Sequence, residues 1–253
     1  MDKANVKNSP NQKDSGSGVR LNKYLAECGV CSRREGDKLI EAGKVLINGQ
    51  IAGMGCKVQP GDEVRVGKKI LGGKPKATVL AFYKPVGVTC TEKDKYAEKI
   101  INDYIDYPVR VTYAGRLDKD SEGLLLLTND GDLINAVMRG AHGHEKEYIV
   151  KVNQEIAASF LEEMQRGVYL KELETKTRPC KVEKIGKFTF RIILTQGLNR
   201  QIRRMCKALG YEVTSLKRIR VMNVELGKLT PGKYREVTGP ELEELYRAAL
   251  SGN

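Results

Sequence analysis

The spacing of apolar and polar residues predicts two short helices near the start of the chain. Residues 20–29 carry apolar side chains at helical spacing and end in a glycine, which suits the end of a helix. Residues 32–43 predict a second helix. Ser32 followed by Glu35 is a capping-box pattern, and Gly43 stands where this helix would end.

A predicted hairpin and a short strand complete this first segment. Asn48-Gly49 lies between two apolar runs, and this dipeptide is typical of a two-residue hairpin turn. Pro60-Gly61-Asp62 then precedes the short alternating run EVRV. Two helices, a hairpin and a strand within residues 19–71 predict a small α+β module.

The longer remaining part, residues 77–253, mixes predicted strands and helices without strict alternation. Strands are expected at 77–85, 123–130, 146–152 and 188–197, and near 213, 221 and 237. Helices are expected at 99–105, 132–140, 157–167, 199–210 and 240–250. This order favours a mixed α+β sheet over a doubly wound one. The stretch GGKPK at 72–76 has no apolar anchor and predicts a linker.

Charge narrows the class of partner. The 253 residues include 44 Lys and Arg against 32 Asp and Glu, a formal net charge of +12, so RNA, DNA and an anionic membrane are the candidates. No apolar run approaches the ~20 residues that cross a bilayer, so membrane is the weakest. Residues 1–18 are polar and lack the apolar core of a signal peptide. We therefore expect a disordered tail and a cytoplasmic protein whose six cysteines remain thiols.

One loop could carry chemistry. In AGRLDKDSEGLLLLTNDGDL, residues 114–133, Asp118 stands just before an apolar strand, although a capping or surface role is the plainer interpretation of the pattern alone. The only histidines, His142 and His144, give two metal ligands, which do not make a site. Cys28 and Cys31 lack a second ligand pair. We therefore expect neither a metal nor a cofactor.

The first segment resembles the S4, or αL-type, RNA-binding domain. The stretch RLNKYLAECGVCSRREGDKLIEAGKVLINGQ and the PGDEV ending stand in the order of that family. The resemblance implies RNA binding through the two-helix face. The basic residues on that face are Arg20, Lys23, Arg33, Arg34 and Lys38. On charge alone, a solvated basic helix face remains an equal alternative.

The second segment resembles the catalytic domain of the RsuA-type pseudouridine synthases. The stretches that carry the resemblance are YKPVGV at 83–88, the AGRLD loop, HEKEYIVKV at 144–152 and GLNRQIRRMCKALGYEV at 197–213. The resemblance implies an S4 domain followed by a mixed-sheet catalytic domain. The implied reaction breaks the C1′–N1 bond of a uridine in RNA and rejoins uracil through C5, without a cofactor.

The resemblance also assigns roles to single residues. It implies that Asp118 is the catalytic carboxylate, Arg116 displaces the target base, Tyr148 stacks on uracil, and Arg203 pairs with Asp118. Tyr148 as a core aromatic and Arg203 on a solvated helix face remain alternatives. The carboxylate either attacks the sugar or base or abstracts a proton. The expected phosphate-binding residues are Lys84, Arg200 and Arg204.

The partner expected from the same motifs is ribosomal RNA. HEKEY and GLNRQIRRMC are most similar to family members that act on the large-subunit RNA, and transfer RNA is a second candidate substrate. We expect a monomer with no membrane partner. The rival hypothesis from another class is a non-catalytic S4-type RNA-binding protein.

Overall fold

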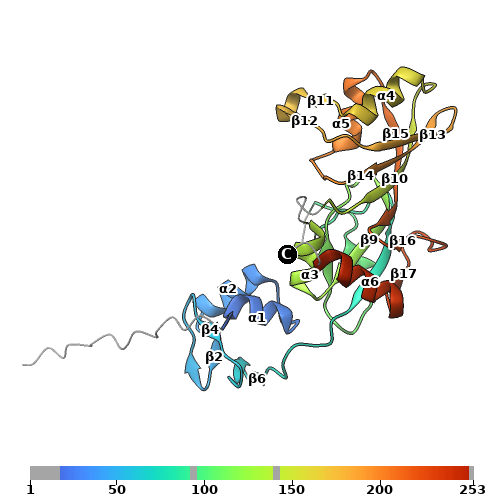
Figure 1. Ribbon diagram of the computed structural model, residues 1–253. Helices are drawn as coiled ribbons and strands as arrows, with labels where there is room; N and C mark the ends of the chain where they lie inside the picture. Colours follow the sequence, from blue (N-terminus) through green and yellow to red (C-terminus); the bar gives the residue numbers. More distant parts are fainter. Residues whose placement is uncertain (1–17, 92–95, 139–142, 251–253) are drawn as a thin grey trace, which may run out of the picture. The chain divides into compact units, whose positions relative to one another are not determined.

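The computed structural model describes residues 18–91, 96–138 and 143–250, and the chain divides into two compact units (Figure 1). Unit 1 comprises residues 1–75 and unit 2 comprises residues 76–253. The expected linker at 72–76 spans this division. Apart from Gly18, the tail expected at 1–18 lies outside the described residues.

Unit 1 packs two helices against small sheets. Helices α1 (Leu21–Glu27) and α2 (Arg33–Glu41) have the predicted positions, and Ser32 and Glu35 form the capping box in both directions. Leu25, Ile40 and Val45 are buried between these elements. The strands are β1 (Val19–Arg20) paired with β4 (Lys57–Val58), and a sheet of β3 (Gln50–Ile51), β2 (Val45–Ile47), β5 (Val64–Val66) and β6 (Lys69–Ile70).

The Asn-Gly hairpin and the Pro-Gly-Asp turn hold each other in place. Asn48 and Gly49 have φ angles of +52° and +81°, as a two-residue turn between right-twisted strands requires. The side-chain amide of Asn48 donates to Asp62 at 2.8 Å, and its oxygen accepts from the backbone N–H of Glu63 at 2.9 Å. Two turn signals separated in sequence therefore form one hydrogen-bonded structure.

Unit 2 is built on a mixed sheet whose nine strands all lie in the described residues. The order of its main path is β13-β14-β10-β15-β9-β7-β17, with β16 added to β15 and β8 added to β9. Strands β9 and β15 are parallel, and the other pairs are antiparallel. The strands are β7 (Val79–Lys84), β8 (Thr112–Ala114), β9 (Glu122–Thr128), β10 (Lys146–Val152), β13 (Lys181–Gly186), β14 (Thr189–Leu194), β15 (Val213–Val221), β16 (Val224–Glu225) and β17 (Tyr234–Glu236). The mixed sheet expected from the sequence is confirmed.

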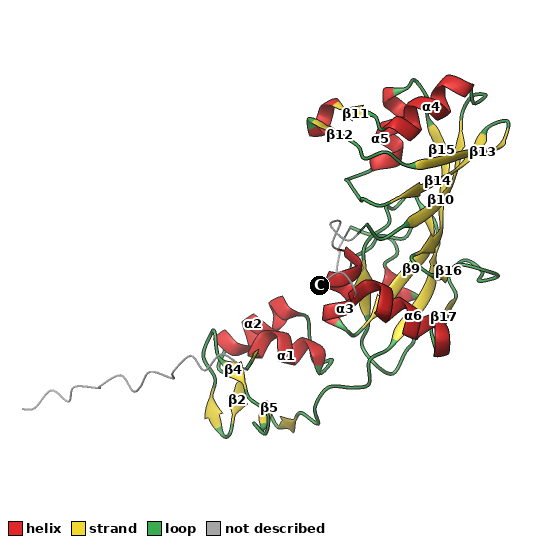
Figure 2. Ribbon diagram, in the orientation of Figure 1, coloured by secondary structure: helices red, strands yellow, loops and turns green. Residues whose placement is uncertain are grey.

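The helices of unit 2 gather at two ends of the sheet (Figure 2). Helices α4 (Ala158–Arg166) and α5 (Gln201–Ala208) cover β10, β14 and β15, with a small hairpin of β11 (Tyr169–Leu170) and β12 (Thr175–Lys176) beside them. Helices α3 (Gly131–Met138) and α6 (Gly239–Leu250) cover the end that holds β7 and β9. No helix in the described part of the chain is long and apolar enough to cross a membrane.

The uninterrupted leucine run of β9 is explained by burial on both faces. Leu124 and Leu126 pack in the cluster formed with α3 and α6. Leu125 and Leu127 face the opposite side and pack against Phe82 and its neighbours. Because neither face meets water, the strand does not need the alternation of an edge or surface strand.

Several elements differ from the expectation. The strands expected near Val213 and Val221 are one continuous strand, which adapts to β10 through irregularities in its register. The helix expected at 99–105 is a single 3-10 turn, Ile101–Asp103, in which the Asp103 side chain accepts from the backbone N–H of Ile100. Strand β13 was not expected, because four of its six residues are exposed or charged.

Candidate active site

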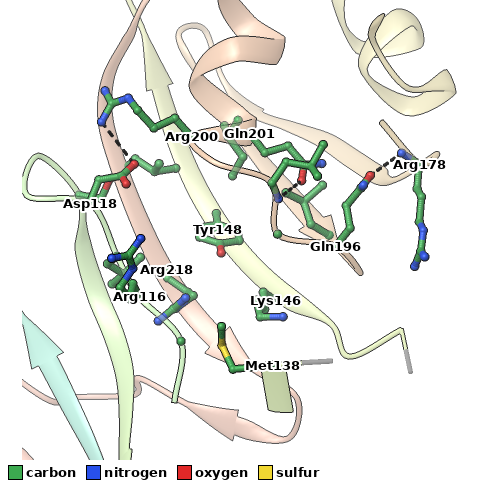
Figure 3. Close-up of a pocket in the computed structure, with 18 residues that line it drawn as sticks. Arg116, Asp118, Met138, Lys146, Tyr148, Arg178, Gln196, Arg200, Gln201 and Arg218 are labelled. Carbon is green, nitrogen blue, oxygen red and sulfur yellow. Dashed lines mark hydrogen bonds and ion pairs between the residues drawn. The ribbon is translucent and has the colours of Figure 1, made fainter. Parts of the chain in front are cut away.

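A cavity of about 430 Å³ opens in unit 2 between the loop before β9, strands β10 and β15, and the segment that leads into α5 (Figure 3). Asp118, Tyr148 and Arg116, which the family resemblance assigned to one site, all line this cavity. The polar side chains of its wall are those of Arg116, Asp118, Ser121, Lys146, Tyr148, Arg178, Gln196, Arg200, Gln201 and Arg218.

The loop that carries Asp118 is fixed by its backbone. Gly115 adopts φ +89°, a conformation that favours glycine, and Leu117 turns into the core. The carbonyl of Lys119 accepts from the N–H of Gly87 at 2.7 Å. The carbonyl of Asp118 accepts from the N–H of Ser121 at 3.1 Å. The Asp118 carboxylate remains 34% exposed and is presented to the cavity.

Lys84 lies beneath this loop. Its ammonium group is fully buried and donates to the carbonyls of Pro85 at 2.8 Å and Ser121 at 2.7 Å. Burial lowers the pKa of Lys84 to about 8. The prediction that Lys84 meets phosphates is therefore wrong, because the side chain holds the loop from inside and cannot reach RNA.

Buried Lys84 predicts a specific pH dependence of stability. Its pKa is about 8 in the folded chain and near 10.5 when exposed, so the unfolded chain binds more protons between these values. Stability should therefore rise with pH in this window, by about 1 kcal/mol per pH unit. Denaturant unfolding of wild type and Lys84→Met at pH 7–10 measures the difference in slope. Lys119→Met, at an exposed site, should keep the wild-type slope.

Arg200 is the cation that reaches Asp118. It precedes α5 in a left-handed conformation, φ +50°, which costs a non-glycine residue ~1 kcal/mol or more. Its guanidinium lies 3.4 Å from the Asp118 carboxylate and donates to both oxygens of Asp120 at 3.2 and 2.9 Å. These hydrogen bonds lower the pKa of Asp120.

Arg203 does not form the expected ion pair with Asp118. It lies one helical turn beyond Arg200, and its guanidinium donates to the carbonyl of Asp120 at 2.8 Å and to the Ser121 hydroxyl at 3.2 Å. Arg203 therefore holds the backbone of the loop and forms an ion pair with Asp120 at 3.4 Å, while Arg200 is the arginine that contacts Asp118. The resemblance missed this because the left-handed residue redirects the Arg200 side chain.

Tyr148 has two environments. It stands on β10, half-buried, and packs at the margin of the core clusters on either side while its ring also lines the cavity (Figure 3). The core and stacking interpretations of this residue are therefore compatible. Arg116 is exposed at the cavity wall.

The other residues predicted to bind RNA differ in their exposure and in their contacts. Arg33, Arg34 and Lys38 are exposed on α2, and Arg20 is exposed at the end of β1. Lys23 forms an ion pair with Glu27 at 3.5 Å.

Arg204 is not part of the cavity wall. Its guanidinium pairs with Glu172 and donates to the carbonyl of Asn199. The expectation that it binds phosphate would require RNA to displace the carboxylate.

The sequence did not single out two cavity residues, Lys146 and Arg218. Arg218 lies two residues after buried Leu216 on β15, so both occupy inward positions of one strand. The feature of the sequence that could have identified Arg218 is an arginine at an inward-facing position of a strand. His144 is buried, and His142 lies outside the described residues. Within the described ranges no group of three or more His, Cys, Asp or Glu side chains could hold a metal.

Two family models match the chain. The model described as RNA pseudouridylate synthase matches residues 78–208, and the S4 domain model matches residues 19–64. The Dual-specificity RNA pseudouridine synthase RluF of Escherichia coli (strain K12) is 47% identical over 233 residues, which is 91% of this chain and 79% of that protein. Ribosomal large subunit pseudouridine synthase B of Bacillus subtilis (strain 168) is 38% identical over 242 residues, 92% of this chain and 98% of its own length.

A solved structure agrees with these matches. The crystal structure of a pseudouridylate synthase superimposes with a TM-score of 0.67 at 30% identity, covering 90% of this chain and 99% of that one. The S4 motifs lie within the residues that the S4 domain model matches, and the AGRLD loop lies within those that the synthase model matches. The mixed sheet agrees with the solved structure. These matches confirm the resemblance drawn from the sequence. The chain therefore belongs to the RNA pseudouridylate synthase family and is an RNA pseudouridine synthase with an N-terminal S4 domain.

Proposed function

We propose that this enzyme isomerises a uridine of large-subunit ribosomal RNA, with Asp118 as its catalytic carboxylate. The observation that supports the assignment most is the Asp118–Arg200 ion pair at the wall of a cavity that Tyr148 also lines. A relative named as a large-subunit synthase supports the choice of RNA, and another named as dual-specificity makes transfer RNA a second candidate.

The reaction needs a base removed from its RNA stack. Extrusion costs a few kcal/mol, and stacking on an aromatic ring such as that of Tyr148 recovers ~1–3 kcal/mol. We propose that Arg116, which is exposed at the cavity wall, occupies the space that the base leaves.

The carboxylate of Asp118 then acts at the sugar or the base, as nucleophile or as proton acceptor. Arg200 fixes the rotamer of Asp118 through a charge-assisted contact. Arg203 and Lys84 hold the carbonyls of the same loop. We propose that these two are positioning residues and that they do not bind RNA.

The remaining proposals concern the two domains, the oligomeric state and the cellular location of the enzyme. We propose that unit 1 is the S4 RNA-binding domain and unit 2 the catalytic domain, joined at 72–76. We also propose that the enzyme acts as a monomer. We place the enzyme in the cytoplasm, because ribosomal RNA resides there in bacteria, the source of these relatives.

The direct test uses RNA labelled with tritium at C5 of uridine. Isomerisation releases this hydrogen to water when C5 bonds to the sugar. Transcripts of large-subunit, small-subunit and transfer RNA are incubated with the protein in EDTA and without cofactor, and the modified position is then mapped. Release from the large-subunit transcript at one nucleotide is the expected result. Release from small-subunit RNA alone would overturn the choice of substrate.

The basic face of α2 should contribute salt-dependent affinity without affecting the chemical step. Arg33→Ala with Arg34→Ala should weaken RNA binding, and each lost phosphate contact should flatten the slope of log K against log salt by somewhat under ~1. The single-turnover rate at saturating RNA should change little. Binding at three salt concentrations measures the slope.

A matched control is the double change Lys68→Ala with Lys69→Ala. It removes the same charge from an exposed part of the same unit. An equal loss of slope in both double variants would mean that affinity follows total charge and that the α2 face has no special role.

A further inference from the structure

Arg218 is a buried arginine in the wall of the cavity that has no counter-charge. It stands in the middle of β15 with 3% of its surface exposed. Its Nε donates to the carbonyl of Leu124 at 2.7 Å. Its Nη2 is buried and has no hydrogen-bond partner within the described ranges, and no described carboxylate forms an ion pair with it.

This arrangement is costly for the folded protein. A guanidinium stays charged at any physiological pH, and burying it without an anion or a full set of hydrogen bonds is unfavourable. Its surroundings add to the cost. Burial and the charge of Arg218 lower the pKa of Lys146 in the same cavity, and Lys84 is a further buried cation nearby. The described residues of this wall leave a positive charge facing the cavity.

Arg218 lies close to the ring on which the target uracil is proposed to stack. Tyr148 and Arg218 are directly paired across β10 and β15, so their side chains lie on the same face of the sheet. Figure 3 shows the Arg218 side chain below the Tyr148 ring and beside Arg116, with Asp118 and Arg200 above them on the left of the view. A base stacked on Tyr148 therefore lies within the reach of this guanidinium.

The reaction creates an anion at that place. When the C1′–N1 bond breaks, its electron pair leaves with uracil, and negative charge spreads over N1 and the two exocyclic oxygens. The base then bonds to C1′ through C5. The proton of C5 is lost and N1 regains a proton, so no oxidant or reductant is needed. A phosphate is a less suitable partner, because the exposed Arg116 and Arg200 meet the solvent side while Arg218 is buried.

We propose that Arg218 donates a hydrogen bond to an exocyclic oxygen of the extruded uracil and stabilises the anionic base while the glycosidic bond is broken. The inference rests on the proposed function, in that the cavity beside Asp118 holds the uracil. Donors fixed in a dry site before charge develops act in this way in other enzymes, and removing one lowers the rate ~10²–10³-fold.

The test varies the stability of the departing base. RNA carries either uridine or 5-fluorouridine at the target position, and fluorine makes the base a better leaving group by withdrawing electrons. Arg218→Met and Arg218→Lys are compared with wild type in single turnovers at saturating RNA, following consumption of the target nucleoside after digestion. Lys217→Met is the matched control. It removes a cation from the neighbouring position of β15, where Lys217 lies over the Tyr83 ring outside the cavity.

Arg218→Met should slow the uridine reaction ~10²–10³-fold. The ratio of the wild-type rate to the Arg218→Met rate should be at least ~10-fold smaller with 5-fluorouridine than with uridine. The reason is that fluorine already stabilises the anionic base, so the guanidinium contributes less. Arg218→Lys should fall between, and Lys217→Met should match wild type on both substrates. Circular dichroism and RNA affinity report folding and binding.

An equal deficit on both substrates would overturn the proposal and leave Arg218 a structural residue. A full rate for Arg218→Met would overturn it as well. If the Met variant does not fold, the same comparison is made with Arg218→Lys, and failure of both to fold assigns Arg218 to the core. A wild-type enzyme that converts no RNA, or an active Asp118→Asn, would instead show that the proposed function fails.

Discussion

Replacing Asp118 by Asn should lower the rate of pseudouridine formation by roughly 10³-fold or more, because losses of that size follow removal of a central catalytic group. An amide has nearly the same shape as a carboxylate but can act neither as the nucleophile nor as the proton acceptor. Since Asp118 is partly exposed and contributes a single ion pair, folding and RNA affinity should change little. Single-turnover tritium release and RNA binding measure the two effects separately.

Asp120→Asn is the matched control for this change. Asp120 is two residues away, and Arg200 binds its carboxylate more closely than that of Asp118. We expect this variant to retain far more activity, since the Asp120 side chain helps to place Arg200 and Arg203 but does not line the cavity. Turnover of Asp118→Asn within tenfold of wild type would remove Asp118 from the mechanism.

Replacing Gly123 by Ala should prevent unit 2 from folding or lower its free energy of unfolding by about 4 kcal/mol or more. Among single substitutions, losses of this size are found only for severe defects in the core. A Cβ at this position would lie 2.2 Å from the carbonyl oxygen of Arg218 and 2.7 Å from its nitrogen. These are backbone atoms of the neighbouring strand, so neither can turn aside. The φ angle of +107° adds strain for any residue but glycine.

Gly131→Ala provides the comparison, because a Cβ there meets nothing within 4 Å and the residue begins α3. We expect that variant to be as stable as wild type. Denaturant unfolding followed by circular dichroism measures both variants. A Gly123→Ala protein with wild-type stability would mean that β9 and β15 are less closely joined than the structure has them.

Local patterns predicted much of the fold because their causes are local. The capping box joins Ser32 and Glu35, three residues apart, and the turn at Asn48 follows from the positive φ angles that Asn48 and Gly49 themselves tolerate. The fourfold leucine run of β9 predicted a strand, and the structure buries both of its faces. Strand β13 was missed because its exposed residues carry no alternating apolar signal, and only pairing with β14 makes it a strand.

The candidate site was partly predictable for a different reason. The resemblance placed Asp118, Arg116 and Tyr148, and the structure brings all three to one cavity. It assigned the ion pair to Arg203 where the structure has Arg200, because the direction of the Arg200 side chain depends on a left-handed residue that is not glycine. Nor did it show that Lys84 points inward, since a lysine before a proline is equally compatible with an exposed loop.

The double-sided burial of β9 has a consequence for synthesis of the chain. Leu124 and Leu126 are covered in part by Leu245 of α6, a helix that leaves the ribosome after every other described element. About 110 residues separate the end of β9 from the start of α6, which is roughly 6–22 s of translation at ~5–20 residues per second. During this time the nascent chain carries an apolar strand with one face open. We therefore expect unit 2 to close only after α6 has been synthesised, with its leucine run available to ribosome-associated chaperones until then.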